Sequence, residues 1–153
     1  MTQPESFGLD HTAVAAPYIR VADRLTLTGG SAVTKFDLRF CQPNVDHLEM
    51  PAVHSIEHML AGFLRDHTRG VIDISPMGCQ TGFYLLMDGA RTVDEIAPVL
   101  ESACRDILAA TAVPAANEAQ CGWAASHSLE AAQAAVSRFL AARDEWGTVF
   151  AGE

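Results

Sequence analysis

The connections between the strand-like segments of this chain are too short to allow neighbouring strands to run parallel. Two runs rich in Thr and Val, residues 19–27 and 32–41, are separated by only four residues, two of them glycines. Two shorter runs, residues 71–75 and 82–87, are separated by six residues. A parallel pair needs a crossover of a dozen or more residues, so each pair predicts an antiparallel hairpin.

Helical patterns occupy much of the remaining sequence. Apolar residues recur at helical spacing over residues 51–66, with Pro51 in the first turn, and again over residues 92–108. Ser128 can cap a final alanine-rich helix that reaches about residue 146. The order predicts an α+β fold in one domain over residues 1–153, an antiparallel β-sheet with helices packed on one face.

Composition excludes some classes of function. Hydrophobic residues make up 49% of the 153 residues and charged residues 19%, which is typical of a folded globular protein. The formal net charge is −9 and no basic run is present, so nucleic acid is not an expected partner. No apolar window approaches a membrane span, and the start of the chain lacks signal-peptide features, so we expect a cytoplasmic protein with no membrane partner.

The motif His54-Ser55-Ile56-Glu57-His58 is the strongest local indication of chemistry. Residues four apart on a helix project from one face, so the two imidazoles can share a metal ion. Glu57 lies between them, where its carboxylate can move protons without being a ligand. The alternative is a pair of ordinary histidines on an amphipathic helix, although burying three polar groups without a metal is costly.

The four cysteines have different surroundings in the sequence. Cys121 lies in an irregular segment and is the candidate third ligand, because borderline divalent ions accept thiolate with imidazole. Cys79 lies in a turn between two strands, a suitable place for a reactive thiol. Cys104 falls on an apolar helical stripe and is expected in the core, whereas Cys41 alternates onto a polar strand face and is expected to line the site. Two histidines and one cysteine leave a coordination position open, which favours an enzyme with one divalent metal per chain.

Five blocks in this order resemble the S-ribosylhomocysteine lyase (LuxS) family, whose product is the precursor of autoinducer-2. The blocks are Glu5-Ser6-Phe7-Gly8-Leu9-Asp10-His11, Phe40-Cys41-Gln42-Pro43-Asn44, His54 to His58, Asp73 to Gly82, and Pro114 to Gly122. The resemblance covers nearly the whole chain. It diverges in residues 45–52 and 64–70, where no matched position lies.

The resemblance implies a homodimer with shared active sites, acting on S-ribosylhomocysteine. Carbonyl migration through enediolates and a final β-elimination would give homocysteine and 4,5-dihydroxy-2,3-pentanedione. The implied metal is Fe(II) in the cell, with Zn(II) or Co(II) as substitutes. The implied roles are metal ligands for His54, His58 and Cys121, acid/base catalysis for Cys79 and Glu57, and substrate contacts for Ser6, His11, Arg39 and Asp73. Arg39 could pair with the substrate carboxylate.

Two other interpretations remain at this stage. In an inverted-motif zinc metallopeptidase, Glu57 would activate a metal-bound water, but that class leaves Cys79 without a role. In a non-enzymatic protein, the metal would only stabilise the fold, and a further protein group would close its fourth position.

Overall fold

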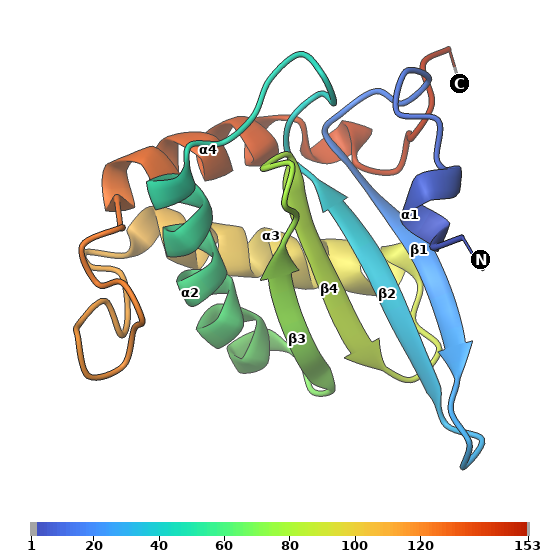
Figure 1. Cartoon of the computed structure of the whole chain (residues 1–153), viewed down its shortest axis with the longest axis horizontal. Helices are drawn as coiled ribbons and strands as arrows, with labels where there is room; N and C mark the ends of the chain where they lie inside the picture. Colours follow the sequence, from blue (N-terminus) through green and yellow to red (C-terminus); the bar gives the residue numbers. More distant parts are fainter. Residues whose placement is uncertain (1–2, 153) are drawn as a thin grey trace.

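A computed structural model describes residues 3–152, and Figure 1 shows its helices and strands. The elements are α1 (Glu5–Gly8), β1 (Tyr18–Thr26), β2 (Ala32–Arg39), α2 (Met50–His67), β3 (Val71–Pro76), β4 (Gly82–Asp88), α3 (Val93–Ala109), α4 (Leu129–Ala141) and the 3-10 helix η1 (Arg143–Glu145). The strands form one antiparallel sheet in the order β1-β2-β4-β3. The core lies between this sheet and α2, α3 and α4. The predicted α+β class is confirmed, although the short α1 was not predicted.

Alternation along the strands determines which side chains enter the core. Ile19, Leu38 and Phe83 pair across three adjacent strands and are buried beneath the helices. Arg20 and Asp37 are the next residues in register, so they point to the opposite face of the sheet. We call this second surface the open face, because the three long helices leave it uncovered. It carries most of the polar strand residues considered below.

The helices begin where the sequence predicts. α2 has Pro51 in its first turn and buries its apolar stripe in the core. α3 begins with a capping box, in which the Glu95 amide donates to Thr92 Oγ1 at 3.3 Å and the Thr92 amide donates to the Glu95 carboxylate at 2.7 Å. Ser128 caps α4 by accepting the Ala131 amide at 3.1 Å. Local signals therefore determined all three N-termini.

The prediction that the last helix reaches about Trp146 is wrong beyond Ala141. Ala142 leaves the helical conformation, and the 3-10 helix η1 follows. This turn brings the buried Trp146 ring onto Phe139, with ring centroids 4.4 Å apart, and its Nε1 donates to the Phe139 carbonyl at 3.0 Å. A continuous helix would carry residue 146 about 10 Å along the axis from residue 139, so packing of the Trp146 ring decides this end.

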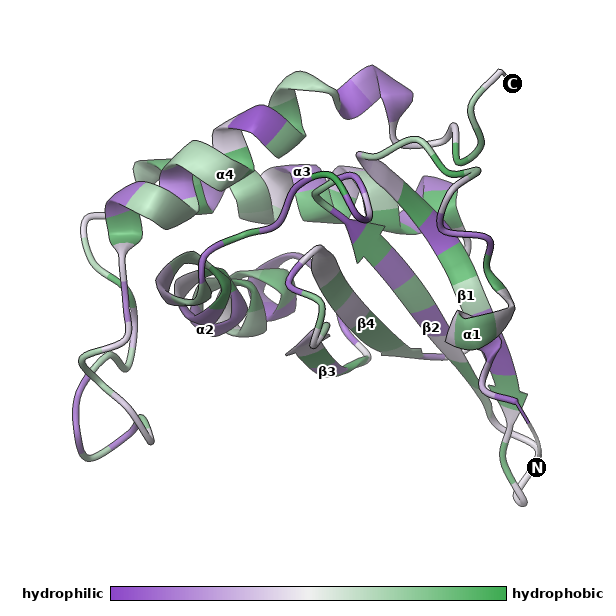
Figure 2. Cartoon of the chain, turned by 45° about the horizontal axis from the view of Figure 1, so that its top comes forward, coloured by the Kyte–Doolittle hydropathy of each residue, from purple (hydrophilic) through white to green (hydrophobic). Residues whose placement is uncertain are grey.

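Hydropathy follows the same division between core and surface. Figure 2 shows hydrophobic and hydrophilic residues alternating along the helices and strands, as expected where one side of each element packs. Within residues 3–152, none of the helices combines the length and apolar character needed to cross a membrane.

Candidate active site

Four potential metal ligands meet beside the first turns of α2. His54 and His58 lie one turn apart on this helix, and Cys121 and His127 come from the segment between α3 and α4. One ligand atom from each residue lies within 4.8 Å of all the others. The structure therefore brings together the three ligands that the sequence predicts. His127 was not predicted, although it follows Cys121 by six residues in the same irregular segment.

Backbone carbonyls hold the two helix histidines in one tautomer. His54 Nδ1 lies 2.8 Å from the Ser126 carbonyl oxygen, and His58 Nδ1 lies 2.9 Å from the Pro114 carbonyl oxygen. A carbonyl only accepts hydrogen bonds, so each Nδ1 carries a hydrogen, and a neutral ring then has its lone pair on Nε2, where a metal can bind. His54 Nε2 lies 3.4 Å from Cys121 Sγ. Two neutral imidazoles and one thiolate fit a borderline divalent ion, and their outer hydrogen bonds resemble those of known metal sites.

His127 is the fourth member of this group and lies against His54 and Cys121. Its ring stacks on that of His54, with centroids 3.9 Å apart and planes inclined by 25°. Its Nδ1 lies 3.1 Å from Ser55 Oγ and its Nε2 lies 3.4 Å from Cys121 Sγ. Burial, followed by repulsion from His54 and His58, lowers the pKa of His127.

Glu57 and Asp73 lie outside this group of ligands. Glu57 Oε2 is 3.9 Å from His58 Nε2, and its side chain is 31% exposed, so it can reach a molecule bound at the cluster. Asp73 lies on β3, exposed, and accepts a hydrogen bond of 2.5 Å from the Ser75 hydroxyl. The structure thus puts one predicted acid/base residue beside the candidate metal centre.

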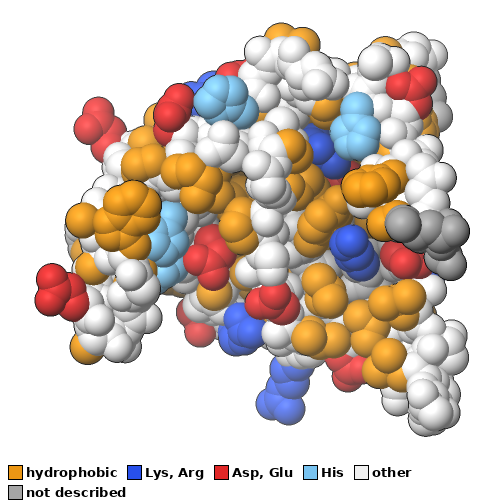
Figure 3. All heavy atoms as spheres, viewed as in Figure 1, with side chains coloured by type: hydrophobic (Ala, Val, Ile, Leu, Met, Phe, Trp, Pro, Cys, Tyr) orange, Lys and Arg blue, Asp and Glu red, His pale blue; other side chains and the backbone are white. Residues whose placement is uncertain are grey.

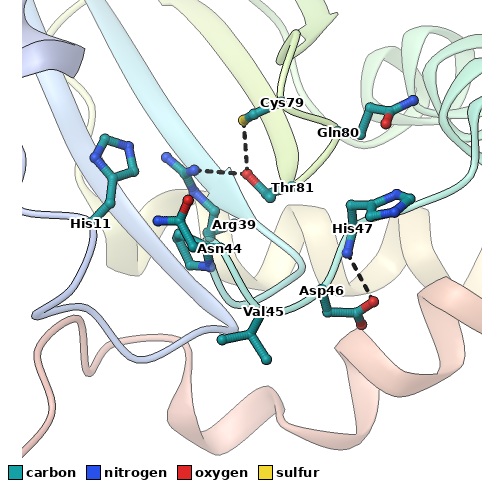
Figure 4. Close-up of a pocket in the computed structure, with 10 residues that line it drawn as sticks. His11, Arg39, Asn44, Val45, Asp46, His47, Cys79, Gln80 and Thr81 are labelled. Carbon is teal, nitrogen blue, oxygen red and sulfur yellow. Dashed lines mark hydrogen bonds between the residues drawn. The ribbon is translucent and has the colours of Figure 1, made fainter.

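The remaining predicted residues line two adjoining cavities at the connection between β3 and β4. The larger cavity, of about 550 Å³, is lined by His11, Arg39, Cys79 and Thr81 together with residues 43–47 and Gln80 (Figure 4). The smaller, of about 270 Å³, shares His11, Arg39 and Cys79 and adds Ser6. Four residues predicted from the resemblance therefore gather in one place.

Arg39 is the charged centre of these cavities and is only 2% exposed. Burial by itself would lower the pKa of Arg39, but hydrogen bonds and attraction to Asp37 outweigh this effect and raise it. Arg39 Nη2 and Nε donate to the Asp37 carboxylate at 2.8 and 3.1 Å, and Arg20 Nε donates to it at 3.1 Å. Arg39 is thus a fixed cation. Asp37, which was not predicted as a site residue, holds it in place.

Thr81 connects this cation to Cys79. Arg39 Nη1 donates to Thr81 Oγ1 at 2.8 Å, and Thr81 Oγ1 lies 3.0 Å from Cys79 Sγ (Figure 4). A guanidinium has no acceptor, so Arg39 uses only a lone pair of the hydroxyl. The hydroxyl hydrogen of Thr81 is therefore free to donate to the Cys79 sulfur. Sequence analysis missed Thr81, whose position two residues after Cys79 in a turn was its only local signal.

The two groups of residues do not share a cavity. Neither cavity is lined by His54, His58, Glu57 or Cys121. Within the described chain, these two cavities therefore reach Cys79 but not the candidate metal centre.

Cys41 does not line the site, contrary to the expectation from strand alternation. β2 ends at Arg39, so the alternation no longer applies at residue 41. Cys41 is 6% exposed and belongs to the core, where burial raises the pKa of its thiol to about 11. Cys104 is in the core as predicted, and burial raises its pKa to about 12.

Comparison with known proteins gives matches along nearly the whole chain. A family model described as S-Ribosylhomocysteinase (LuxS) matches residues 4–150. The chain is 54% identical over 147 residues to an S-ribosylhomocysteine lyase of Chromohalobacter salexigens, covering 96% of this chain and 95% of that protein. Proteins of the same name from Listeria monocytogenes and Helicobacter acinonychis are 53% identical over 146 residues and 52% identical over 145 residues. These two alignments cover 95% of this chain, and 94% and 92% of the respective relatives.

Proposed function

The chain belongs to the S-ribosylhomocysteinase (LuxS) family, and from this premise we propose that it is an S-ribosylhomocysteine lyase, a carbon–sulfur lyase. The observation that carries the proposal is the meeting of His54, His58 and Cys121 at one point, in a chain similar to lyases of that name from end to end. The products would be homocysteine and 4,5-dihydroxy-2,3-pentanedione.

The candidate metal centre suits this reaction. His54, His58 and Cys121 would hold one divalent ion, Fe(II) in the cell and Zn(II) or Co(II) as substitutes. When bound, such an ion supplies a Lewis acid that stabilises negative charge on a carbonyl oxygen. Three protein ligands leave a position for substrate, as a catalytic centre requires.

Cys79 and Glu57 would exchange protons with the substrate. As a thiolate and a carboxylate they remove a proton from one carbon and return it to the next, which moves the carbonyl along the ribose without net oxidation or reduction. In the last step the carbon beside the ketone loses its proton, its electron pair forms a carbon–carbon double bond, and the carbon–sulfur bond breaks. Homocysteine then leaves as the thiolate.

Ser6, His11, Arg39 and Asp73 would contact the substrate. Arg39 has five N–H donors and uses three of them on Asp37 and Thr81. Two donors remain for a bound carboxylate at the edge of the cavity. The 550 Å³ cavity is within the usual volume range for a small-molecule site.

We further propose a homodimer whose active sites each combine residues of two copies. The reaction needs a Lewis acid and Cys79 on one substrate, whereas in a single chain neither cavity beside Cys79 is lined by a proposed metal ligand. A two-fold axis can bring the cavity beside Cys79 in each copy to the metal-ligand group of the other copy, which gives two equivalent sites. Figure 3 shows hydrophobic side chains gathered over the strands on the open face of the sheet. Leu25 and Phe7, 47% and 71% exposed, are among the large apolar residues that a second copy could cover.

The cytoplasm is the proposed location, and autoinducer synthesis the proposed role. All four cysteines are free, as suits a reducing compartment. The metallopeptidase interpretation is not favoured, because it accounts for α2 alone and not for the cavity around Cys79. A purely structural metal is not favoured either, because it gives no role to Glu57 or Arg39.

The decisive experiment is an anaerobic incubation of the Fe(II)- or Co(II)-loaded protein with S-ribosylhomocysteine. We expect release of one free thiol per substrate, detected with a chromogenic disulfide, and formation of the pentanedione, detected by mass spectrometry. Cys79→Ala should bind metal and release no thiol. If the loaded parent protein releases no thiol, the proposed function is wrong.

A further inference from the structure

His127 is the one member of the metal-ligand group for which the proposed function has no role. An imidazole beside a metal-bound thiolate can act in two ways. Its Nε2 can keep a lone pair and bind the ion as a fourth ligand, or it can carry the hydrogen and donate it to the sulfur. A lone pair facing a thiolate at 3.4 Å with no cation between them would be repulsive. The choice therefore depends on ring geometry and on hydrogen bonding at Nδ1.

The stacked rings of His54 and His127 are too close for both to bind one ion. Two imidazoles on a tetrahedral ion hold their centroids roughly 5 Å apart, because each lies beyond a bond of about 2.0 Å and the bonds diverge at the tetrahedral angle. His54 and His58 are 4.7 Å apart, close to that value, whereas His54 and His127 are 3.9 Å apart. His54 is the ligand of the stacked pair, since its carbonyl partner leaves the lone pair of Nε2 free to bind.

Ser55 can provide the hydrogen that His127 Nδ1 then requires. Ser55 Oγ accepts the Ser128 amide at 2.9 Å, and its own hydrogen can go to the Pro51 carbonyl at 2.8 Å or to His127 Nδ1 at 3.1 Å. The single Ser128 N–H is shared with the Pro51 carbonyl, which accepts it at 3.3 Å, so this carbonyl keeps a donor when the hydroxyl turns away. Directing the hydroxyl to His127 Nδ1 puts the ring hydrogen on Nε2, 3.4 Å from Cys121 Sγ.

We propose that His127 is a positioning residue outside the ligand set, which receives a hydrogen bond from Ser55 and donates one from Nε2 to the Cys121 thiolate. The hydrogen bond spreads the charge of the thiolate and orients the sulfur, while the stack supports the ring of His54. Because His127 stays off the ion, a coordination position remains open for substrate. This inference rests on the proposed metal centre and not on the identity of the substrate.

Cobalt-substituted protein tests the proposal without relying on turnover. His127→Phe keeps a ring that can stack and removes the donor, whereas His127→Gln puts an amide N–H near the position of Nε2. X-ray absorption counts the imidazole and sulfur ligands, the thiolate-to-cobalt charge-transfer band reports on the hydrogen bond to sulfur, and competition with a chelator measures retention. We expect two imidazoles and one sulfur in the parent and in His127→Phe alike.

In His127→Phe the charge-transfer band should move to lower energy, and cobalt should be lost about 10- to 100-fold more readily, the usual effect of removing an outer hydrogen-bond partner. His127→Gln should return both properties toward those of the parent. Three imidazoles in the parent, or a band and a retention unchanged in His127→Phe, would overturn the proposal. A parent protein that binds cobalt and releases thiol but shows three imidazoles refutes this inference alone, whereas one that binds no cobalt refutes the proposed function as well.

Discussion

Among single residues, Thr81 has the most direct influence on the reactive thiol. It receives a hydrogen bond from Arg39 and has its own hydrogen free for Cys79, so a buried cation acts on the sulfur through one hydroxyl. A hydrogen bond from this hydroxyl is stronger to a thiolate, the form that reacts with alkylating agents, than to a neutral thiol.

Thr81→Val should therefore slow alkylation of Cys79 at neutral pH. Valine keeps the shape of threonine and removes the hydroxyl, and a hydrogen bond to a charged group contributes about 1.5 kcal/mol, so the rate with iodoacetamide should fall about tenfold. Thr81→Ser is the matched control and should react nearly as fast as the parent. Equal rates for Thr81→Val and Thr81→Ser would show that the hydroxyl does not act on the sulfur.

The four cysteines should react in a definite order. Burial raises the pKa of Cys41 to about 11 and that of Cys104 to about 12, so both remain neutral thiols at pH 8. The raised values favour the folded state at pH 8, and this contribution declines as the pH rises through the folded-state values. Limiting iodoacetamide at pH 8, followed by peptide mass spectrometry, should find Cys79 modified first. Cys41 reacting as fast as Cys79 would contradict its burial.

Among the elements, α2 carries most of the candidate metal centre. Its two histidines lie one turn apart, and each is oriented by a carbonyl from the segment between α3 and α4. The helix thus fixes the spacing of the ligands, while a segment distant in sequence fixes their rotation.

Removal of one ligand should abolish metal binding. His58→Ala or Cys121→Ala leaves two of the three proposed ligands, so elemental analysis after gel filtration should find the divalent ion lost. Glu57→Ala should keep one ion per chain, because its carboxylate lies outside the ligand group. Full occupancy in Cys121→Ala would show that the sulfur is not a ligand.

The sheet depends on a close approach at Gly82, where β4 passes β2. A Cβ on this residue would lie 2.2 Å from the Leu38 carbonyl oxygen, so the two strands would have to move apart. We expect Gly82→Ala to lower the free energy of unfolding by ~2 kcal/mol or more, as strain in a packed core does. The matched control is Gly62→Ala on α2, where a Cβ meets nothing within 4 Å. It should stabilise the helix by ~0.5–1 kcal/mol in the same urea titration.

For the molecule as a whole, the metal-ligand group and the cavities around Cys79 do not meet within one chain. This determines which inactive variants can complement each other in the proposed dimer. His11 and Cys79 line the same cavities of one chain. A mixture of His11→Ala and Cys79→Ala chains should therefore recover no activity in the proposed dimer. Every site of such a mixed dimer would contain one defective cavity.

The informative mixture pairs Glu57→Ala with Cys79→Ala. Each mixed dimer would then have one site with both defects and one site with neither. Random exchange should restore about a quarter of the parent thiol-release activity, because half of the dimers are mixed and half of their sites are intact. The mixture of His11→Ala and Cys79→Ala serves as the control and should stay inactive. No recovery in the first mixture after demonstrated subunit exchange would exclude sites shared in this way.

The sequence by itself determined the hairpins, the helix starts and the pair of histidines on α2, because each depends on residues within a few positions of one another. It also singled out Cys121, whose irregular surroundings differ from those of the core cysteine Cys104. The resemblance to a family supplied the cavity residues Ser6 and His11, which no local pattern distinguishes.

Only the tertiary structure decided the rest. His127 reaches the cluster because a segment about 70 residues away folds back on α2, as the contact of His54 with Ser126 shows. Thr81 and Asp37 matter through buried partners, and Cys41 enters the core because β2 ends two residues before it. These features depend on long-range packing and on burial of charge, neither of which has a local period in the sequence. Long-range packing also decides that the metal-ligand group does not line the cavities around Cys79, because the group lies on α2 and the cavities lie at the β3–β4 connection.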